Sequence, residues 1–413
     1  MVDGEKLTKG RGKILDLLFV ALILTSLLIS RFYYFTWDNK GSEEKYFRLV
    51  IKTTYSNIDN KAWHLTEDDL SIGLFMNNSW QTVYLISSSH PIKTFHLDSD
   101  GNTIALLDIA EKAVLPGEKL SYNVTYKLVF RERKLPQISE EESGTLNDIP
   151  EDLKKEYCKP TSLWQSDIPA LKMKAQLIAG NEVRVLTILK KFIKWIANNI
   201  TYGSSEIPRY PNETFSQRTG DCDDQANLLV TFCRAVGIPA YLQLGCIYMP
   251  KYNRSLPYWS GHLLLKQVGV GWHGWAIVYA PPWGWLPVDL TFVRGNPKIE
   301  PIDAILHSAV VEDFTFQYMN ITVSDYIAET VLFKDFLEAN EFYIYEEDIM
   351  TVEEVTEKWT LQPFPGKLIC PVFPSTLIIH YHRYKSSMRI VYIQKNTLKN
   401  LSLRECVEWR SLR

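Results

Sequence analysis

A cysteine, a histidine and an aspartate, in that chain order, are the residues with the clearest chemistry in this sequence. Cys222 follows a glycine loop and lies in the first turn of a helix predicted over 221–236. Partial positive charge and free N–H groups at a helix start favour a thiolate and can hold an oxyanion, so we expect a lowered pKa for this thiol. Asp221, Asp223 and Asp224 crowd the same turn, where their charges oppose the thiolate or simply cap the helix. The thiol therefore needs a histidine partner.

The histidine expected to meet this need is His273, in the strand candidate 272–280. Asp289 lies sixteen residues further on, in the strand candidate 285–292. A hairpin of this size brings the two side chains together, and an acid beside a histidine fixes its tautomer and stabilises the imidazolium. Trp275 is expected to pack beside the imidazole as support. Each residue alone also suits ordinary packing or capping, but the three together favour a nucleophilic thiol site.

Three separate blocks of this sequence resemble the transglutaminase-like superfamily: 220–240, 273–275 and 285–289. The resemblance extends over about residues 165–300. It implies a papain-like α+β core, with helices packed on an antiparallel sheet, and thiol chemistry on amide or peptide bonds. The family's catalytic residues then fall on Cys222, His273 and Asp289.

The resemblance also suggests an aromatic side chain upstream of the cysteine that donates to the oxyanion. Tyr202 is the first candidate and Trp195 the second, with ordinary core packing as the alternative for both. Position 225 is Gln, where relatives often carry an aromatic residue. Animal members use calcium, but the acidic residues beside Cys222 lack the spacing of a calcium loop, so we expect no metal and no other cofactor.

The amino end predicts a membrane anchor. Basic residues occupy the tail 1–13, and an apolar run with an aromatic end follows at 14–35. This pattern is typical of one spanning helix, and the positive-inside rule leaves the tail in the cytoplasm and the rest of the chain outside. A cleaved signal peptide is the alternative. Seven N-x-S/T sequons agree with an extracytoplasmic location at the cell membrane.

Hydrophobic periodicity divides the remaining chain. Period-two alternation predicts an immunoglobulin-like β-sandwich at 45–135, and a polar, acidic segment at 136–156 reads as a linker. Helices followed by strands then make the catalytic domain at 157–310. The remainder, 311–413, is predicted as an α+β region of unknown role, with a helix near 324–340.

Composition limits the classes of function. The chain has 46% hydrophobic and 23% charged residues and a net charge of −3, which is typical of a folded globular protein without a nucleic-acid role. We expect a membrane-anchored thiol enzyme acting on protein or peptide substrates, either as a protease or amidase or by transferring the acyl group to an amine. The alternative is a non-enzymatic cell-surface binding or assembly module on the same fold.

Overall fold

The computed structural model describes residues 44–291, 300–307, 310 and 314–354, and the backbone of 378–380 and 391–393. The chain divides into two units, Met1–Glu44 and Lys45–Arg413, and the described elements belong to the second. No helix among these described residues is long and apolar enough to cross a membrane. The anchor predicted at 14–35 lies outside them.

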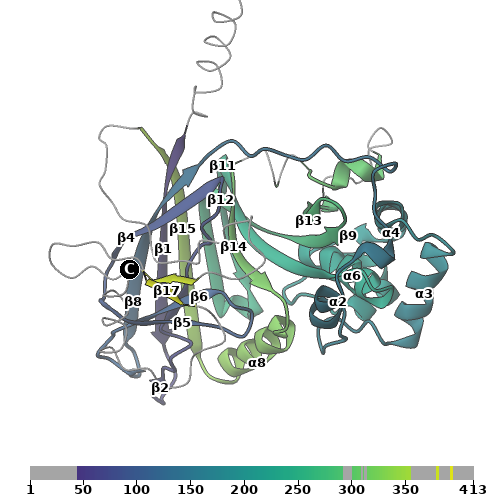
Figure 1. Ribbon diagram of the computed structural model, residues 1–413. Coiled ribbons are helices and arrows are strands. Elements are labelled where there is room, and N and C mark those ends of the chain that lie inside the picture. The colour runs from purple at the N-terminus through teal and green to yellow at the C-terminus, as the bar shows by residue number, and fades with distance from the viewer. Residues whose placement is uncertain are drawn as a thin grey trace, which may run out of the picture. The chain divides into compact units, whose positions relative to one another are not determined.

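One eight-stranded sheet organises the second unit (Figure 1). Its strands are β1 (Lys45–Asn57), β4 (Gln81–Ser88), β8 (Lys119–Phe130), β11 (Ala240–Tyr258), β12 (Leu263–Ala280), β13 (Gly284–Val288), β14 (Thr315–Ile321) and β15 (Phe342–Glu353). They lie in the order β14-β11-β12-β15-β1-β8-β4, and β13 pairs with β12. All neighbours are antiparallel except β12 and β15, which are parallel.

This sheet is continuous across the boundaries expected from the sequence. β1, β4 and β8 come from the segment predicted as a separate sandwich, yet β1 also pairs along its length with β15 from the carboxyl-terminal region. Leu49 thus lies between Tyr126 on β8 and Met350 on β15. The alternation predicts that each strand buries one face, but it carries no information about which distant strand lies beside it.

Smaller sheets cover the inner face of β1, β4 and β8. They are formed by β3 (Ser71–Gly73), β6 (Thr103–Leu107) and β5 (Ile92–Leu97), and by β2 (Trp63–His64) with β7 (Ala113–Val114). The buried core between these layers also takes in Cys246 from β11, Phe316 from β14 and Met350 from β15. The layered core expected for 45–135 is therefore completed by strands from much later in the chain.

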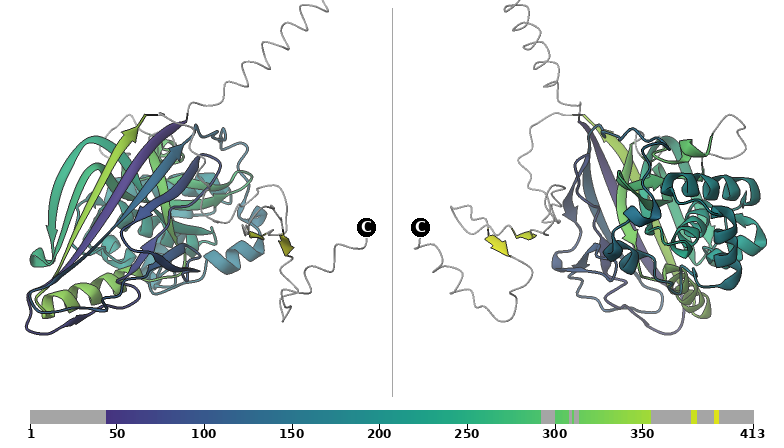
Figure 2. Two further views of the ribbon diagram at one scale, coloured as in Figure 1. Left: turned by 90° about the vertical axis from the view of Figure 1, so that its left-hand side faces the viewer. Right: turned by 45° about the vertical axis from the view of Figure 1, so that its right-hand side comes forward.

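Helices pack against the part of the large sheet that β11, β12 and β13 form. They are α2 (Glu151–Tyr157), α3 (Pro169–Ala179), α4 (Val185–Asn199), α5 (Pro211–Gln217) and α6 (Cys222–Ala235). Figure 2 shows them gathered beside the curled sheet, away from β4 and β8. The apolar stripe of α4 and nearly all of α6 are buried in one core with the ends of β11, β12 and β13. Helices and a curled sheet make a mixed α and β structure, consistent with a transglutaminase-like fold.

The segment 136–156, predicted as a linker, packs against the helical part. It contains the 3-10 turn η1 (Leu146–Asp148) and the start of α2, and Ile149 is buried. Gly144 donates its N–H to the carbonyl of Pro281 at 2.8 Å. Apolar residues scattered in an acidic stretch give little periodicity, so the sequence did not reveal this docking.

Later elements include the 3-10 turn η4 (Pro301–Ala304) and α8 (Tyr326–Ala339), which matches the helix predicted near 324–340. The short strands β16 (Ile378–His380) and β17 (Val391–Ile393) pair with each other in antiparallel fashion. Of these elements, η4 packs against α4, whereas α8 contacts β15 and reaches the first turn of α6 through its first residue, Tyr326.

Candidate active site

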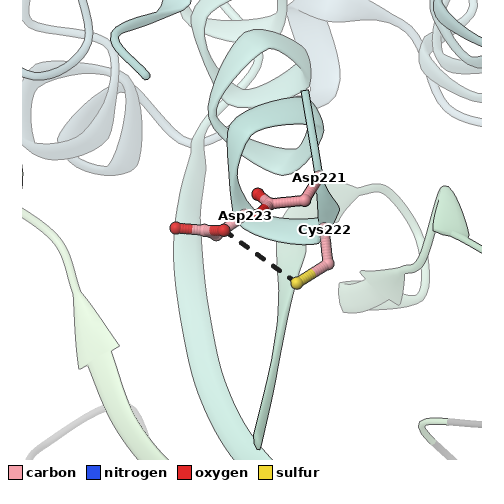
Figure 3. Close-up of side chains that lie close together, drawn as sticks. All are labelled: Asp221, Cys222 and Asp223. Atoms are coloured by element: carbon pink, nitrogen blue, oxygen red, sulfur yellow. Dashed lines mark hydrogen bonds between the residues drawn. The ribbon is translucent and has the colours of Figure 1, made fainter. Parts of the chain in front are cut away.

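Cys222 occupies the first position of α6, as its sequence context predicts (Figure 3). Asp221, the N-cap residue, has an extended backbone, and its N–H donates to the carboxylate of Asp224 at 3.2 Å. Gly220 precedes it at a point where a Cβ atom would lie 2.7 Å from the Cβ of Asp224 and 2.9 Å from the Cγ2 of Thr214. Only glycine lets the chain approach the helix this closely.

The first turn of α6 lies directly against β12. A Cβ atom added at Gly274 would lie 3.0 Å from the Cβ of Asp223, so the strand and the helix start are nearly in backbone contact. The backbone N–H of Gly274 hydrogen-bonds the Cys222 sulfur and lowers its pKa. His273 is the residue before Gly274 on β12, so the strand that contacts the start of α6 also carries the candidate histidine.

His273 and Asp289 are brought together by the predicted hairpin. β13 pairs with β12 from Ala280↔Gly284 to Ala276↔Val288. Asp289 comes directly after Val288, the last residue of β13. Nε2 of His273 lies 2.7 Å from Oδ2 of Asp289. The other oxygen of Asp289 accepts from the backbone N–H of Thr291 at 2.8 Å.

This pair is shielded from water. The side chain of His273 is 8% exposed and that of Asp289 is 1% exposed. A buried carboxylate at Nε2 orients the ring and leaves Nδ1 as the nitrogen on the opposite edge from the acid. The arrangement suits an imidazole that exchanges a proton through Nδ1.

The electrostatics of Cys222 differ from the expectation of a lowered pKa. Burial raises the pKa of the thiol first, and the charges of Asp223 and Asp221 raise it further. Hydrogen bonds from the backbone of Gly274 and Asp223 act in the opposite direction but are smaller. The sulfur lies 3.9 Å from Oδ1 of Asp223 (Figure 3). Burial and the local charges thus outweigh the helix terminus, and the expectation that the thiol needs His273 as its partner stays a prediction.

The acidic residues around Cys222 fall into two groups. Asp224 is buried and pairs with Arg209, whose Nη1 lies 3.0 Å from Oδ2 and whose backbone N–H donates at 2.6 Å. Burial raises the pKa of Asp224 to about 6. Burial and the charge of Asp223 raise the pKa of Asp221 to about 9. Asp224 therefore forms a structural ion pair with Arg209 that holds the loop before the helix. Asp221 and Asp223 are the acidic residues that flank the Cys222 sulfur.

Asp221, Cys222 and Asp223 also bring ligand-type atoms within 4.8 Å of one another. We assign this group to thiol chemistry, because a metal bound there would occupy the sulfur that the proposed reaction needs as a nucleophile. The expectation that the protein needs no metal stays a prediction.

Trp275 lies where the sequence suggested, as a supporting residue. Its ring centroid is 5.9 Å from that of His273, and its Nε1 donates to Oε1 of Gln243 at 3.1 Å. The side chain is 1% exposed. It packs beside the imidazole and is itself fixed by a buried hydrogen bond.

The two oxyanion candidates have different surroundings. Tyr202 is 48% exposed and lies on β9 (Thr201–Tyr202), directly opposite Gly220 on β10 (Thr219–Gly220). Trp195 on α4 packs between the rings of Phe215 and Phe232, at 5.7 and 5.5 Å. Packing accounts for Trp195, so Tyr202 is the candidate that remains near the thiol; its role stays a prediction.

Sequence reasoning missed the roles of four residues at this site. Tyr326 on α8 donates its hydroxyl to Oδ2 of Asp223 at 2.7 Å, and Asn227 and Trp164 continue the chain of hydrogen bonds. Gln225 donates to the carbonyl of Gly220 at 2.8 Å and so braces the loop before Cys222. Buried polar side chains on an apolar helix signal such networks for Gln225 and Asn227. No local signal marks Tyr326, which lies a hundred residues downstream.

Comparisons with known proteins agree with this geometry. The model of the transglutaminase-like superfamily matches residues 172–290, which hold Cys222, His273 and Asp289. The family resemblance predicted from the sequence blocks is therefore confirmed for this segment. No curated protein matches the chain.

Several solved structures are similar to the chain at low identity. A candidate cysteine protease from Cytophaga hutchinsonii is 18% identical, with 78% of this chain and 94% of that one covered and a TM-score of 0.44. The periplasmic domain of TgpA from Pseudomonas aeruginosa, bound to ethylmercury, is 14% identical, with 63% and 94% covered and a TM-score of 0.29. A candidate protease from Parabacteroides distasonis is 11% identical, with 62% and 68% covered and a TM-score of 0.21. Likenesses this distant carry no argument about the reaction.

Proposed function

We propose that this protein is a thiol enzyme that cleaves amide or peptide bonds through a thioester on Cys222. The single observation that carries the proposal is the buried His273–Asp289 pair at 2.7 Å, on a strand whose next residue, Gly274, packs against the helix turn of Cys222. A histidine with a buried acid on one nitrogen, on a strand that contacts the helix turn of a cysteine, supplies the parts of a nucleophile and its base.

The raised pKa of Cys222 determines how the reaction begins. The thiol is neutral at rest, so its proton moves to Nδ1 of His273 as the sulfur attacks the carbonyl carbon. Asp289 stabilises the imidazolium that forms. Collapse of the tetrahedral intermediate breaks the C–N bond, and His273 returns the proton to the leaving amine.

The thioester is resolved by a second nucleophile. His273 takes a proton from water or from an amine, which attacks the acyl carbon. The C–S bond then breaks, and the imidazolium returns the proton to the departing Cys222 sulfur. Backbone N–H groups at the start of α6, with Tyr202 as a further donor, would hold the oxyanion in both steps. Hydrolysis is the favoured outcome for an extracytoplasmic member, and amine transfer is the other.

The location belongs to the same proposal. The basic tail, the apolar run at 14–35 and the sequons support a single-pass anchor with the thiol site outside the membrane. Protein or peptide chains are then the substrates within reach. Membrane fractionation tests this part: a variant lacking residues 1–35 should move to the soluble fraction, and release of the intact chain by high salt alone would contradict the anchor.

The second candidate is a binding or assembly module that keeps the fold without catalysis. The observation in its favour is that the carboxylates of Asp221 and Asp223 lie beside the Cys222 sulfur, where their charges oppose the thiolate that a nucleophile requires. An intact His273–Asp289 pair argues against this reading, since a module without chemistry has no need for it.

Activity profiling separates these outcomes. The intact chain is incubated with peptide libraries and with glutamine-bearing peptides, with and without a primary amine. We expect release of new peptide ends or ammonia that disappears in Cys222→Ala, and amine incorporation only if the enzyme is a transferase. No turnover with any substrate, together with equal labelling of Cys222 by a thiol probe in wild type and in His273→Ala, would support the module instead.

A further inference from the structure

A line of hydrogen bonds connects α8 to the first turn of α6. The hydroxyl of Tyr326 donates to Oδ2 of Asp223 at 2.7 Å and accepts from Nδ2 of Asn227 at 2.8 Å. Nε1 of Trp164 in turn donates to Oδ1 of Asn227 at 3.3 Å. Each hydrogen bond has a defined donor and acceptor, and all three donate in the same direction, from the indole of Trp164 toward the carboxylate of Asp223.

The line is anchored in the core. Trp164 and Asn227 are fully buried, and Asn227 lies one helical turn after Asp223, on the same face of α6. Tyr326 occupies the first turn of α8, where Asp325 caps the helix by accepting from the backbone N–H of Ala328 at 3.1 Å. The phenol therefore reaches Asp223 from a fixed direction.

The second oxygen of Asp223 faces the nucleophile. Oδ1 lies 3.9 Å from the sulfur of Cys222, so one carboxylate is shared between the phenol of α8 and the thiol. We propose that Tyr326 is a positioning residue: it holds Asp223 against Cys222 and so keeps the nucleophile as a neutral thiol at rest. This inference builds on the proposed function, but its physical content is the ionisation of one thiol.

Other charged groups lie on the elements around the first turn of α6. From α6 and its cap come Asp221 and Asp224, and the latter is neutralised by Arg209. From β12 comes His273, paired with Asp289. Asp221 also raises the pKa of Cys222, and it is held by the N-cap geometry rather than by Tyr326. Of the two carboxylates that raise the pKa of Cys222, Asp223 is the one that a residue of another helix holds in place.

The test follows the pH dependence of Cys222 alkylation in the intact chain. Iodoacetamide is added across a range of pH, and the rate at the Cys222 peptide is read by mass spectrometry, which separates it from Cys158 and the buried cysteines. The variants are Tyr326→Phe, Asp223→Asn and the double variant. Tyr210→Phe is the matched control, because its hydroxyl binds Asp325 at the same end of α8 and does not contact Asp223.

We expect Asp223→Asn to lower the midpoint of the alkylation profile by roughly one to two pH units, since a unit charge near 4 Å from the sulfur is removed. Tyr326→Phe should lower it by about half as much, because the freed carboxylate turns toward water. In the Asp223→Asn background, Tyr326→Phe should add nothing, and Tyr210→Phe should leave the profile unchanged.

Two results would overturn the inference. One is a wild-type profile in Tyr326→Phe, and the other is a shift in the double variant equal to the sum of the two single shifts, which would place Tyr326 outside the path through Asp223. Thermal melting of every variant shows whether it is folded. Because alkylation needs no substrate, the inference can fail while turnover is observed, and it can hold while turnover is absent.

Discussion

Nε2 of His273 lies 2.7 Å from Oδ2 of Asp289, and both side chains are shielded from water. The contact joins two residues of one hairpin, so its geometry is fixed by the pairing of β12 with β13 rather than by a mobile loop. The ring is thereby oriented before any substrate arrives. If the protein is an enzyme, this pre-orientation is where much of its catalytic power should originate.

Substitution of Asp289 tests whether the orientation of His273 contributes to catalysis. Asp289→Asn keeps the shape of the side chain but loses the charge that stabilises the imidazolium, so kcat/KM on a peptide substrate should fall by roughly 10²–10⁴-fold. Steady-state kinetics measure the fall. Asp303→Asn is the control, since this carboxylate caps η4 by accepting from the N–H of Glu300 and does not contact His273. Near-normal turnover in Asp289→Asn would show that catalysis does not need the Asp289 carboxylate.

Gly220→Ala tests the close approach before Cys222. The new Cβ would meet the Cβ of Asp224 and the side chain of Thr214, both in packed surroundings, so either the loop or the helix start must move. We expect a loss of stability of about 1–3 kcal/mol and a larger relative loss of activity. Urea unfolding and turnover are compared.

The matched control is Gly271→Ala on β12. Its Cβ would meet only the sulfur of Met249, the flexible end of a partly exposed side chain that can move aside. Equal effects of the two substitutions would show that the loop before Cys222 tolerates a side chain.

Two carboxylates on β15, the half-buried Glu346 and the buried Asp348, predict a pH-dependent stability. Glu346 and Asp348 lie on the same face of the strand, and Asp348 accepts from Nε1 of Trp272 at 2.7 Å. Burial and the charge of Asp348 raise the pKa of Glu346 to about 8, against an ordinary value of 4.5. Between these values the native state binds more protons than the unfolded state. The free energy of unfolding should therefore fall as the pH rises from about 4.5 to about 8, by a few kcal/mol.

Glu346→Gln should remove most of this decline and stabilise the protein at pH 8. Urea unfolding at several pH values measures it. Glu347→Gln is the control, because this neighbouring carboxylate lies on the other face of the strand, where it pairs with Lys266 near the surface. A stability that is flat with pH in the wild type would refute the assignment of a buried proton to this pair.

Tyr202 and Trp195 should respond differently to substitution. If Tyr202 donates to the oxyanion, Tyr202→Phe lowers kcat by roughly 10–10²-fold with little change in KM or melting temperature. Trp195→Phe should lower the melting temperature and leave kcat nearly unchanged, since its ring packs on Phe215 and Phe232. The reverse pattern would transfer the proposed role to Trp195.

The parts of the site within one short stretch of chain could be predicted. Gly220 and Asp221 mark the start of α6, and the spacing of His273 and Asp289 implies a hairpin, because local turn and capping chemistry decides both. The pKa of Cys222 could not be predicted with the same success. Its value depends on the balance of burial, Asp221 and Asp223 against a few N–H groups, and only the folded geometry weighs them.

The long-range parts of the fold remained hidden. The pairing of β1 with β15 joins residues from Tyr46↔Glu353 to Asn57↔Phe342, which lie far apart in the chain, and the period-two pattern of either strand does not identify its partner. Tyr326 reaches Asp223 for the same reason: α8 is predictable as a helix, but its docking on α6 is a property of the assembled core. The site therefore includes a residue beyond the segment that matches the superfamily.

The central claim is tested most directly by trapping the acyl-enzyme. The intact chain is mixed with an activated acyl ester, quenched in acid within a short time, digested and examined by mass spectrometry. The account predicts an acyl group on Cys222, absent in Cys222→Ala and formed much more slowly in His273→Ala. An acyl group on any other residue, or equal rates on Cys222 in wild type and His273→Ala, would contradict it.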